Sequence, residues 1–285
     1  MSPHTLINGL EEDAITVQDR ALHYGDGLFE TFAVIHSEPQ YWERHYRRLA
    51  CGCKRLKLPL PEEGLLRMEA SQICRGVERG VLKFILTRGR GNRGYRFPDP
   101  MIPTRLFSLY PWPDYPKNYL HHGIRVRICT MRLARNPMLA GIKHLNRLEQ
   151  VLARNEWDDP AIAEGLMLDT EGYVIEGTMT NLFLVWEDTL ISPDLSYCGI
   201  CGIMRECILE AAARLTIPTL IQPVYLGDLY KAEEAFVCNS IIGIWPIRQI
   251  QVEPTHILSQ SRLTSRLVEY VKRAGKVCET PCLNS

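Results

Sequence analysis

The pattern of apolar positions divides the chain into short strands and amphipathic helices. Apolar or β-branched runs bounded by glycine and proline predict strands, and they lie at residues 5–9, 28–35, 40–42, 81–87, 106–110, 124–129, 165–169, 173–175, 181–186, 234–238 and 241–244. Apolar residues that recur at spacings of three and four predict helices, at residues 44–56, 62–79, 146–157 and 204–215. We expect 28–35 and 40–42 to pair as a hairpin, and 165–169 to pair with 173–175.

The order of these elements indicates the fold class. Strands follow one another in hairpins and alternate irregularly with helices, whereas a doubly wound parallel sheet needs a regular alternation of strand, helix and strand. We therefore predict a mixed α/β fold.

A proline-rich segment, residues 111–118, interrupts this pattern. Pro111, Pro113 and Pro116 lie within six residues of one another, and such a run fits neither a helix interior nor a central strand. We therefore predict a smaller N-terminal α/β domain at residues 1–112, a linker at 113–119 and a larger C-terminal α/β domain at 120–285.

The composition is that of a folded, electrically balanced protein. The 285 residues include 33 Lys+Arg, 33 Asp+Glu and 46% hydrophobic residues. This excludes the clustered basic excess of proteins that bind nucleic acid or acidic membranes, and the low hydrophobicity of disordered chains. The N-terminus lacks the basic flank and apolar stretch of a secretory signal, and no run approaches the roughly 18–20 apolar residues of a membrane span. We expect a cytoplasmic protein.

Ten cysteines make metal binding a question. Only Cys198 and Cys201 have the C-x-x-C spacing, whereas a zinc site made from two pairs needs matched spacings. Cys278 and Cys282 are also close in sequence but are spaced differently. Free thiols are the default in a reducing cytosol, so we predict free cysteines and no metal site.

Lys143 is the candidate nucleophile. It lies in an apolar segment, residues 139–146, after a glycine and just before a predicted helix. Apolar surroundings disfavour the charged form of a lysine, so they lower its pKa and make the amine nucleophilic. A surface lysine at the end of a loop is the commoner situation, and the residues alone leave both interpretations open.

Two further segments can hold parts of a ligand. Glu176 ends a predicted strand before a glycine- and threonine-rich turn, where a carboxylate can hold the proton of a ring nitrogen or simply face water. Gly202, Ile203, Met204 and Arg205 open a helix, whose unpaired N–H groups and positive end suit a phosphate. An ordinary glycine-started helix remains the alternative.

Arginines supply candidate anion contacts. Arg48 lies on the helix at 44–56 and can bind a phosphate with paired donors. Arg88, Arg90 and Arg93 lie in a glycine-rich loop, residues 88–95, which suits the recognition of carboxylates. A basic surface loop is the alternative interpretation.

The order and spacing of these segments resemble the fold-type IV pyridoxal-phosphate enzymes. The matching segments follow one another in the family's order, at residues 19–27, 45–49, 88–91, 141–150, 176–183, 202–205 and 237–240. The family includes branched-chain and D-amino-acid aminotransferases as well as a lyase, and the lyase is what residues 143–150 and the triplet Arg93-Gly94-Tyr95 resemble. The resemblance implies a two-domain fold of mostly antiparallel sheets with flanking helices. It also implies an active site between the domains and a homodimer.

The resemblance assigns pyridoxal 5'-phosphate as the cofactor. Lys143 would carry it as a Schiff base and then accept a proton. Glu176 would pair with the protonated ring nitrogen and keep the ring an electron sink. The phosphate contacts would come from Arg48, the backbone of Ile203 and Met204, and the hydroxyl of Ser240.

The implied reaction is the conversion of 4-amino-4-deoxychorismate, a small-molecule substrate, to 4-aminobenzoate and pyruvate, for folate synthesis. Thr31 would be catalytic, near the leaving enolpyruvyl group, and the other substrate contacts would come from Tyr24, Arg88, Arg93 and Tyr95. Glu30 departs from the lyase pattern, because the aminotransferases carry Glu at this position where lyases often have Thr. A D-amino-acid-type aminotransferase is therefore the alternative, while a non-catalytic binding protein would need neither Lys143 nor Glu176.

Overall fold

The computed structural model describes residues 4–251, 255–258 and 262–274, so Cys278 and Cys282 lie outside the described residues. The chain divides into two compact units, one formed by Met1–Pro113 with Ile142–Arg147 and the other by Asp114–Gly141 with Leu148–Ser285. Of the expected linker at 113–119, Pro113 belongs to the first unit and residues 114–119 belong to the second. Residues 142–147, which we expected in the C-terminal domain, belong to the first.

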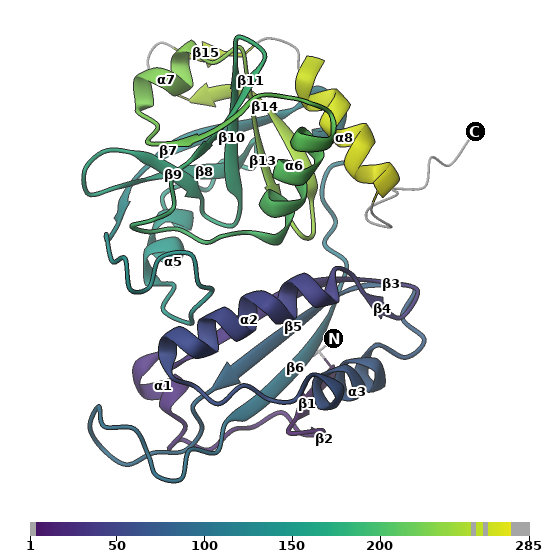
Figure 1. Ribbon diagram of the computed structural model, residues 1–285, viewed down its shortest axis with the longest axis vertical. Coiled ribbons are helices and arrows are strands. Elements are labelled where there is room, and N and C mark those ends of the chain that lie inside the picture. The colour runs from purple at the N-terminus through teal and green to yellow at the C-terminus, as the bar shows by residue number, and fades with distance from the viewer. Residues whose placement is uncertain (1–3, 252–254, 259–261, 275–285) are drawn as a thin grey trace. The chain divides into compact units, whose positions relative to one another are not determined.

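The first unit is built on an antiparallel sheet with the strand order β2-β1-β6-β5-β3-β4. Its strands are β1 (His4–Ile7), β2 (Leu10–Glu11), β3 (Gly27–Ile35), β4 (Glu38–Pro39), β5 (Arg79–Thr87) and β6 (Thr104–Pro111). Helices α2 (Trp42–Leu56) and α3 (Glu63–Cys74) lie on one face of this sheet (Figure 1). The short helix α1 (Arg20–Tyr24) precedes β3.

The two faces of β3 carry different residues, because successive side chains of a strand point to opposite sides. Glu30 and Phe32 contact His45 of α2, through a hydrogen bond and a ring contact at 4.2 Å between centroids. Phe29 and Thr31 therefore lie on the other face of the sheet. This alternation separates the residue that anchors α2 from those that face the candidate nucleophile.

The second unit contains a larger sheet with the strand order β12-β11-β10-β13-β14-β7-β8-β9, with β15 paired to β14. Its strands are β7 (Ile124–Leu133), β8 (Ile162–Asp169), β9 (Val174–Gly177), β10 (Asn181–Trp186), β11 (Thr189–Pro193), β12 (Thr219–Gln222), β13 (Glu234–Asn239), β14 (Gly243–Gln251) and β15 (His256–Ile257). The pairing of Asn181 with Glu176 joins β10 to β9. Strands β10, β13, β14, β7, β8 and β9 thus close into a barrel.

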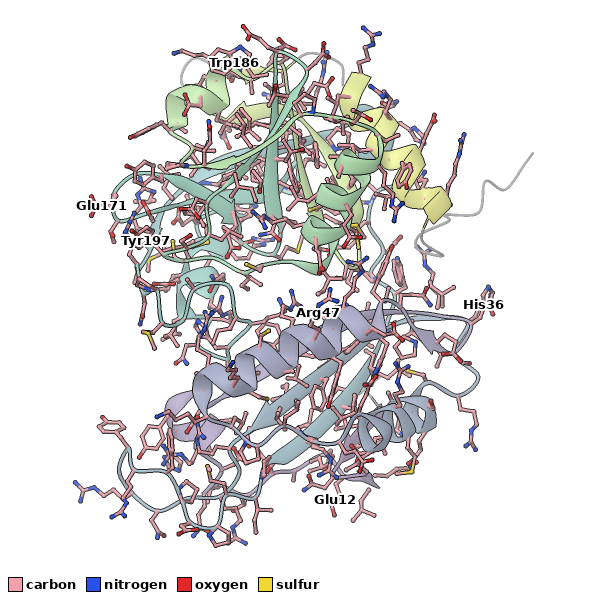
Figure 2. The ribbon with its side chains drawn as sticks, in the orientation of Figure 1. Glu12, His36, Arg47, Glu171, Trp186 and Tyr197 are labelled. Carbon is pink, nitrogen blue, oxygen red and sulfur yellow. The ribbon has the colours of Figure 1, made fainter. Side chains whose placement is uncertain are left out.

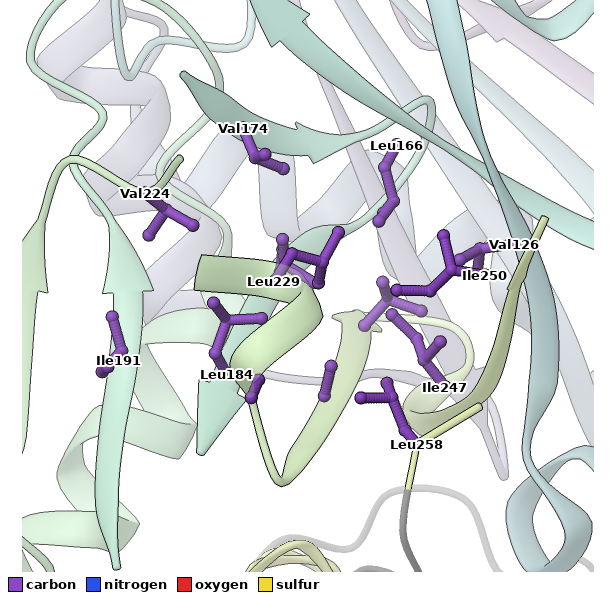
Figure 3. Packing of buried hydrophobic residues seen from close by; sticks show 14 of the residues in the cluster. Val126, Leu166, Val174, Leu184, Ile191, Val224, Leu229, Ile247, Ile250 and Leu258 are labelled. Carbon is purple, nitrogen blue, oxygen red and sulfur yellow. The ribbon is translucent and has the colours of Figure 1, made fainter. Parts of the chain in front are cut away.

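Alternate residues of the barrel strands form a buried cluster together with Ile191, Val224, Leu229 and Leu258 (Figure 3). Leu166 and Leu168 on β8 and Leu182 and Leu184 on β10 belong to one buried apolar cluster. Helices α6 (Ile203–Arg214) and α8 (Arg262–Ala274) pack on β13. The remaining helices of this unit are α4 (Tyr119–His122), α5 (Leu148–Arg154) and α7 (Leu226–Lys231).

The structure corrects part of the predicted secondary structure. Residues 40–42 are not a strand, because Tyr41 adopts a left-handed φ of 56° and the buried Trp42 begins α2. The helix predicted at 62–79 ends at Cys74, because the chain already enters β5 at Arg79. The edge strand β12, its neighbour β11 and the helices α7 and α8 were not predicted.

In the described part of the chain, no helix is long and apolar enough to cross a membrane. The eight cysteines described there are all free.

We predict that Leu166→Ala lowers the free energy of unfolding by about 2–5 kcal/mol, because it leaves a cavity in the barrel interior. Leu220→Ala on β12 is the control, because Leu220 is 49% exposed and its truncation should change stability by less than about 0.5 kcal/mol. Denaturant unfolding followed by tryptophan fluorescence measures both. Equal losses would show that Leu166 is not part of a tightly packed core.

Candidate active site

The segment that carries Lys143 lies along the start of β3. The backbone N–H of Phe29 donates to the carbonyl of Lys143 at 2.9 Å, and the N–H of Leu145 donates to the carbonyl of Gly27 at 3.0 Å. Gly27 has no room for a side chain, since a Cβ there would lie 2.4 Å from the carbonyl oxygen of Leu86. The absence of a side chain at Gly27 therefore allows this close packing.

This pairing places the Lys143 amine over an aromatic ring. Lys143 is half-buried, and its Nζ lies 4.3 Å from the centroid of the Phe29 ring. Thr31, also half-buried, lies two residues further along β3 on the same face. Phe29, which the Lys143 amine contacts, and Thr31 therefore lie on one face of β3, and the catalytic roles of Lys143 and Thr31 stay predictions.

Glu30 lies on the opposite face, within a buried cluster. It is 2% exposed, and its carboxylate accepts from His45 Nδ1 at 2.6 Å. Arg48 donates to both carboxylate oxygens, from Nε at 2.9 Å and from Nη2. Arg47, next to it on α2, is exposed on the outer side of the helix (Figure 2). Glu30 therefore fixes the direction of the Arg48 guanidinium.

The charges of this cluster follow from its contacts. Burial alone would raise the pKa of Glu30, but Arg48 and the His45 hydrogen bond outweigh burial and lower the pKa to about 2. Burial lowers the pKa of His45, although Glu30 opposes this shift. Neutral His45 then carries its proton on Nδ1, which faces Glu30. Glu30 is thus a structural carboxylate, and it does not lie on the sheet face that carries Phe29 and Thr31.

Arg88 is placed differently from our prediction. Its side chain is 2% exposed, and its guanidinium donates to Asp26 Oδ2 at 2.9 Å and to the carbonyls of Leu56 and Lys57 at 2.8 and 2.9 Å. These carbonyls belong to the C-terminal end of α2, where cations are favourable. We therefore correct the assignment of Arg88 from a substrate contact to a structural residue that holds α2 to β5.

The loop after Arg88 is anchored by its backbone. Arg20 donates from Nη1 to the carbonyl of Gly94 at 3.0 Å, and the N–H of Gly94 donates to the Tyr24 hydroxyl at 3.0 Å. The side chains of Arg93 and Tyr95 are exposed, that of Tyr95 by 84%. Tyr24 is half-buried, and its ring lies 5.4 Å from that of Tyr95. Three predicted substrate contacts are thus close neighbours, and the sequence did not identify Arg20 as their anchor.

Glu176 in the second unit is a buried carboxylate. It is 3% exposed, and its Oε2 accepts from the N–H of Ile200 at 2.9 Å and from Asn181 Nδ2 at 3.4 Å. Asn181 Nδ2 also donates to the carbonyl of Ile200 at 2.8 Å. Gly199 keeps this loop close, because a Cβ there would lie 3.3 Å from Glu176 Oε2. A buried carboxylate held in this way can pair with a protonated ring nitrogen.

The N-terminus of α6 follows immediately. Gly202 is its N-cap residue, and no side chain of the described residues caps this end. A Cβ at Gly202 would lie 2.0 Å from Asn181 Oδ1, so glycine is required for this close approach. The next two residues, Ile203 and Met204, are buried. Backbone N–H groups of such a helix start are suitable phosphate donors.

Ser240 lies in the turn after β13 and is half-buried. Asn239 shapes this turn, because its Oδ1 accepts from the N–H groups of Ile241 and Ile242 at 2.8 and 2.9 Å. Asn239 Nδ2 donates to the carbonyl of Met179 at 3.1 Å. The Ser240 turn is therefore tied to the turn that follows Glu176.

Glu164 is a buried carboxylate that the sequence analysis missed. It is 1% exposed and accepts from both the N–H and the hydroxyl of Thr178, at 3.1 and 2.6 Å. Burial raises its pKa, although the hydrogen bonds oppose this shift. A charged residue inside an otherwise apolar strand was the available signal.

The described residues offer donors for a phosphate at the start of α6. Among the residues that the structure describes, no group of three or more His, Cys, Asp or Glu could hold a metal ion. The second unit instead offers an uncapped helix start beside a glycine and a buried carboxylate, and the first offers an amine over an aromatic ring. The helix start suits a phosphate, and the amine suits attachment to a carbonyl compound.

The chain is similar to known proteins over most of its length. The family model of amino-transferase class IV matches residues 27–250. The chain is 32% identical over 262 residues to the aminodeoxychorismate lyase of Vibrio harveyi, and the match covers 92% of this chain and 97% of the relative. It is 45% identical to the 4-amino-4-deoxychorismate lyase of Pseudomonas aeruginosa, with a TM-score of 0.90 over 94% of this chain and 98% of that chain.

A more distant structure shares the fold. A hypothetical aminotransferase from Mycobacterium tuberculosis, solved in a PLP-bound form, is 18% identical, with a TM-score of 0.80 over 95% of this chain and 98% of that chain. The chain described here belongs to the amino-transferase class IV family.

We predict that Glu30→Gln lowers the free energy of unfolding at pH 7 by about 3–5 kcal/mol, because Arg48 loses its buried partner. Glu30 has a lowered pKa in the folded state, so its ionised form contributes stability above its ordinary pKa of 4.5 that is lost as the pH falls toward 2. The variant should lose less stability between pH 5 and pH 3 than the unaltered protein. Denaturant unfolding over a pH series measures this, with the exposed Glu171→Gln as control, and an unchanged pH slope would refute it.

Proposed function

We propose that this chain is a pyridoxal-phosphate-dependent carbon–oxygen lyase that converts 4-amino-4-deoxychorismate to 4-aminobenzoate and pyruvate. The observation that carries the proposal is the 45% identity to the Pseudomonas aeruginosa lyase over nearly the whole of both chains. The placement of the Lys143 amine over Phe29, on the face that carries Thr31, supports it independently.

The cofactor contacts are assigned to residues of both units. Lys143 is the proposed point of covalent attachment, and Glu176 holds a proton at the ring nitrogen. The phosphate is bound by Arg48, the backbone N–H groups of Ile203 and Met204, and the Ser240 hydroxyl. When bound, the cofactor supplies an electron sink for the charge that develops as a proton leaves the substrate.

The proton transfer is proposed for Lys143, and a contact with the leaving group is proposed for Thr31. Once the substrate amine has displaced it, the Lys143 amine takes the proton from the amine-bearing carbon. The phenyl face of Phe29 shields the Lys143 amine from water on one side. The ammonium group that forms when the amine takes the proton lies favourably over the ring. The Thr31 hydroxyl lies on the same sheet face and is proposed to contact the leaving enolpyruvyl group.

The substrate has two carboxylates, one on the ring and one on the enolpyruvyl group, so it needs more than one anion contact. We propose Arg93, with Tyr24 and Tyr95 beside it, as the contact in the glycine-rich loop. Arg88 is excluded from this role because its donors bind Asp26 and the end of α2.

The position of Glu30 bears on the alternative aminotransferase activity. Its identity is typical of the family's aminotransferases, but its carboxylate is bound by His45 and Arg48 on the other side of the sheet. Glu30 therefore cannot contact a substrate bound on the face of β3 where Lys143 lies, so its presence does not favour the aminotransferase.

We further propose that the protein is a cytoplasmic homodimer, as its resemblance to the family implies. Sedimentation of the purified protein would test the dimer.

The purified protein, loaded with pyridoxal 5'-phosphate, should release 4-aminobenzoate and pyruvate in equal amounts from 4-amino-4-deoxychorismate. The comparison reaction is transamination of D-alanine by the same preparation. If D-alanine is transaminated faster than 4-aminobenzoate is released, the aminotransferase is the correct assignment. If the cofactor does not bind, both assignments are wrong.

Lys143→Ala should abolish covalent attachment and reduce lyase turnover by roughly 10²–10⁴-fold or more, because it removes both the attachment point and the proton acceptor. Borohydride reduction followed by mass mapping should label Lys143 in the unaltered protein. Lys231→Ala is the matched control and should keep the label and the activity. A label on Lys83 instead of Lys143 would contradict the assignment.

The two arginines of the loop should behave differently. Arg93→Ala should reduce kcat/KM for 4-aminobenzoate release about ten- to a hundredfold, because a charge-assisted hydrogen bond contributes about 1.5–3 kcal/mol, and should leave the melting temperature unchanged. Arg88→Ala should lower the melting temperature, because the carbonyls at the end of α2 lose their donor and Asp26 loses one of its two arginine partners. Unchanged kcat/KM in Arg93→Ala would show that the loop does not bind substrate.

A further inference from the structure

Glu164 collects more hydrogen-bond donors than an ordinary structural carboxylate needs. Its Oε1 accepts from the N–H and hydroxyl of Thr178 and from the N–H of Gly165, and its Oε2 accepts from the N–H of Met179 and the hydroxyl of Thr180. These distances lie between 2.6 and 3.2 Å. Most of the donors belong to the turn that immediately follows Glu176, so one side chain holds the whole turn.

The turn is also fixed directly at its Glu176 end. The N–H of Gly177 donates to the carbonyl of Thr180 at 2.7 Å, and the N–H of Thr178 donates to the carbonyl of Gly165 at 3.0 Å. A Cβ at Gly177 would lie 2.2 Å from the Thr180 hydroxyl oxygen and 2.8 Å from the Glu164 carboxyl group. The turn is therefore closed tightly around the Glu164 carboxylate, one residue away from Glu176.

The other end of the same turn leads to Ser240. The carbonyl of Met179 accepts from Asn239 Nδ2 at 3.1 Å, and the Asn239 side chain holds the turn that contains Ser240. A continuous set of hydrogen bonds thus runs from Glu164 through Met179 and Asn239 to the Ser240 turn. It connects two segments that lie far apart in the sequence, all within the second unit.

We propose that Glu164 is a positioning residue that sets the spacing between the Glu176 carboxylate and the Ser240 hydroxyl. This inference rests on the proposed function, in which these two groups hold the ring end and the phosphate end of one cofactor. Glu164 itself is buried and does not contact the proposed cofactor. It affects the cofactor contacts only by holding the turn that follows Glu176. Its role is to keep two distant contacts at the separation that a rigid ligand requires.

A carboxylate is needed for this role because all of its partners donate. An ionised carboxylate only accepts, whereas the amide of glutamine would direct two N–H donors toward donors already present. Glu164→Gln should therefore open the turn although the side chain keeps its size. Glu164 lies on the same side of β8 as Leu166 and Leu168, near the start of the strand. The effect of Glu164→Gln should therefore be confined to that end of the barrel.

The second unit offers a matched control in Glu234. It is 6% exposed and accepts from the N–H groups of Leu263 and Thr264 and from the Thr264 hydroxyl, at 2.9, 2.9 and 2.7 Å. It holds the start of α8 and makes no hydrogen bond to the turn after Glu176 among the described contacts. Glu234→Gln should therefore lower the stability of the protein, as Glu164→Gln does, and leave the cofactor contacts unchanged.

The test compares the unaltered protein, Glu164→Gln and Glu234→Gln, each titrated with pyridoxal 5'-phosphate. Both variants should melt at lower temperature without cofactor. Only Glu164→Gln should raise the cofactor dissociation constant, by about tenfold or more, and change the pH dependence of the visible absorbance of bound cofactor. In turnover it should lower kcat more than it raises KM for 4-amino-4-deoxychorismate.

Asn239→Ala keeps the proposal testable if Glu164→Gln does not fold. It breaks the connection at the Ser240 end, so it should weaken cofactor binding and leave the pH dependence of the absorbance unchanged. The proposal is overturned if Glu164→Gln binds and titrates cofactor like Glu234→Gln, or if Asn239→Ala binds it with unchanged affinity. Failure of the unaltered protein to bind pyridoxal 5'-phosphate would instead refute the proposed function.

Discussion

A carboxylate persists in a protein interior only where donors surround it, and both parts of the candidate site depend on this constraint. In the first unit Glu30 is held by His45 and Arg48, and in the second Glu164 and Glu176 are held by backbone N–H groups and by side-chain donors. Each carboxylate fixes its donors in turn. The arrangement of the surrounding loops and helices therefore follows from where these negative charges are buried.

Strand β3 shows how one short sequence serves two purposes. Its alternation places Glu30 against α2, where it directs Arg48, and places Phe29 and Thr31 on the face where Lys143 lies. A shift of one residue in register would exchange these faces. The close packing at Gly27 and the two hydrogen bonds to residues 143 and 145 hold that register.

The candidate site could be predicted in part from the sequence, and the exceptions have a common cause. Lys143, Thr31, Tyr24, Arg93 and Tyr95 were predicted by motif and lie in the first unit, where Tyr24 neighbours Tyr95 and Lys143 lies over Phe29. Arg88 and Glu30 belong to the same motifs, yet their side chains turn inward and bind the protein itself. A motif specifies that a charge is present, but whether it faces a ligand depends on the face of the strand and on the partners that the fold supplies.

The sequence by itself determined the mixed α/β class, most of the strands and the segments that carry the chemistry, because these depend on local periodicity and on residue type. Only the tertiary structure decided that residues 142–147 pack with the first unit, that β9 and β10 close the barrel, and that Glu164 ties the Glu176 turn to Ser240. Those features join residues that are far apart along the chain. Their hydrogen bonds form only when folding brings donor and acceptor within about 3 Å of each other, and no local pattern records which distant partner that will be.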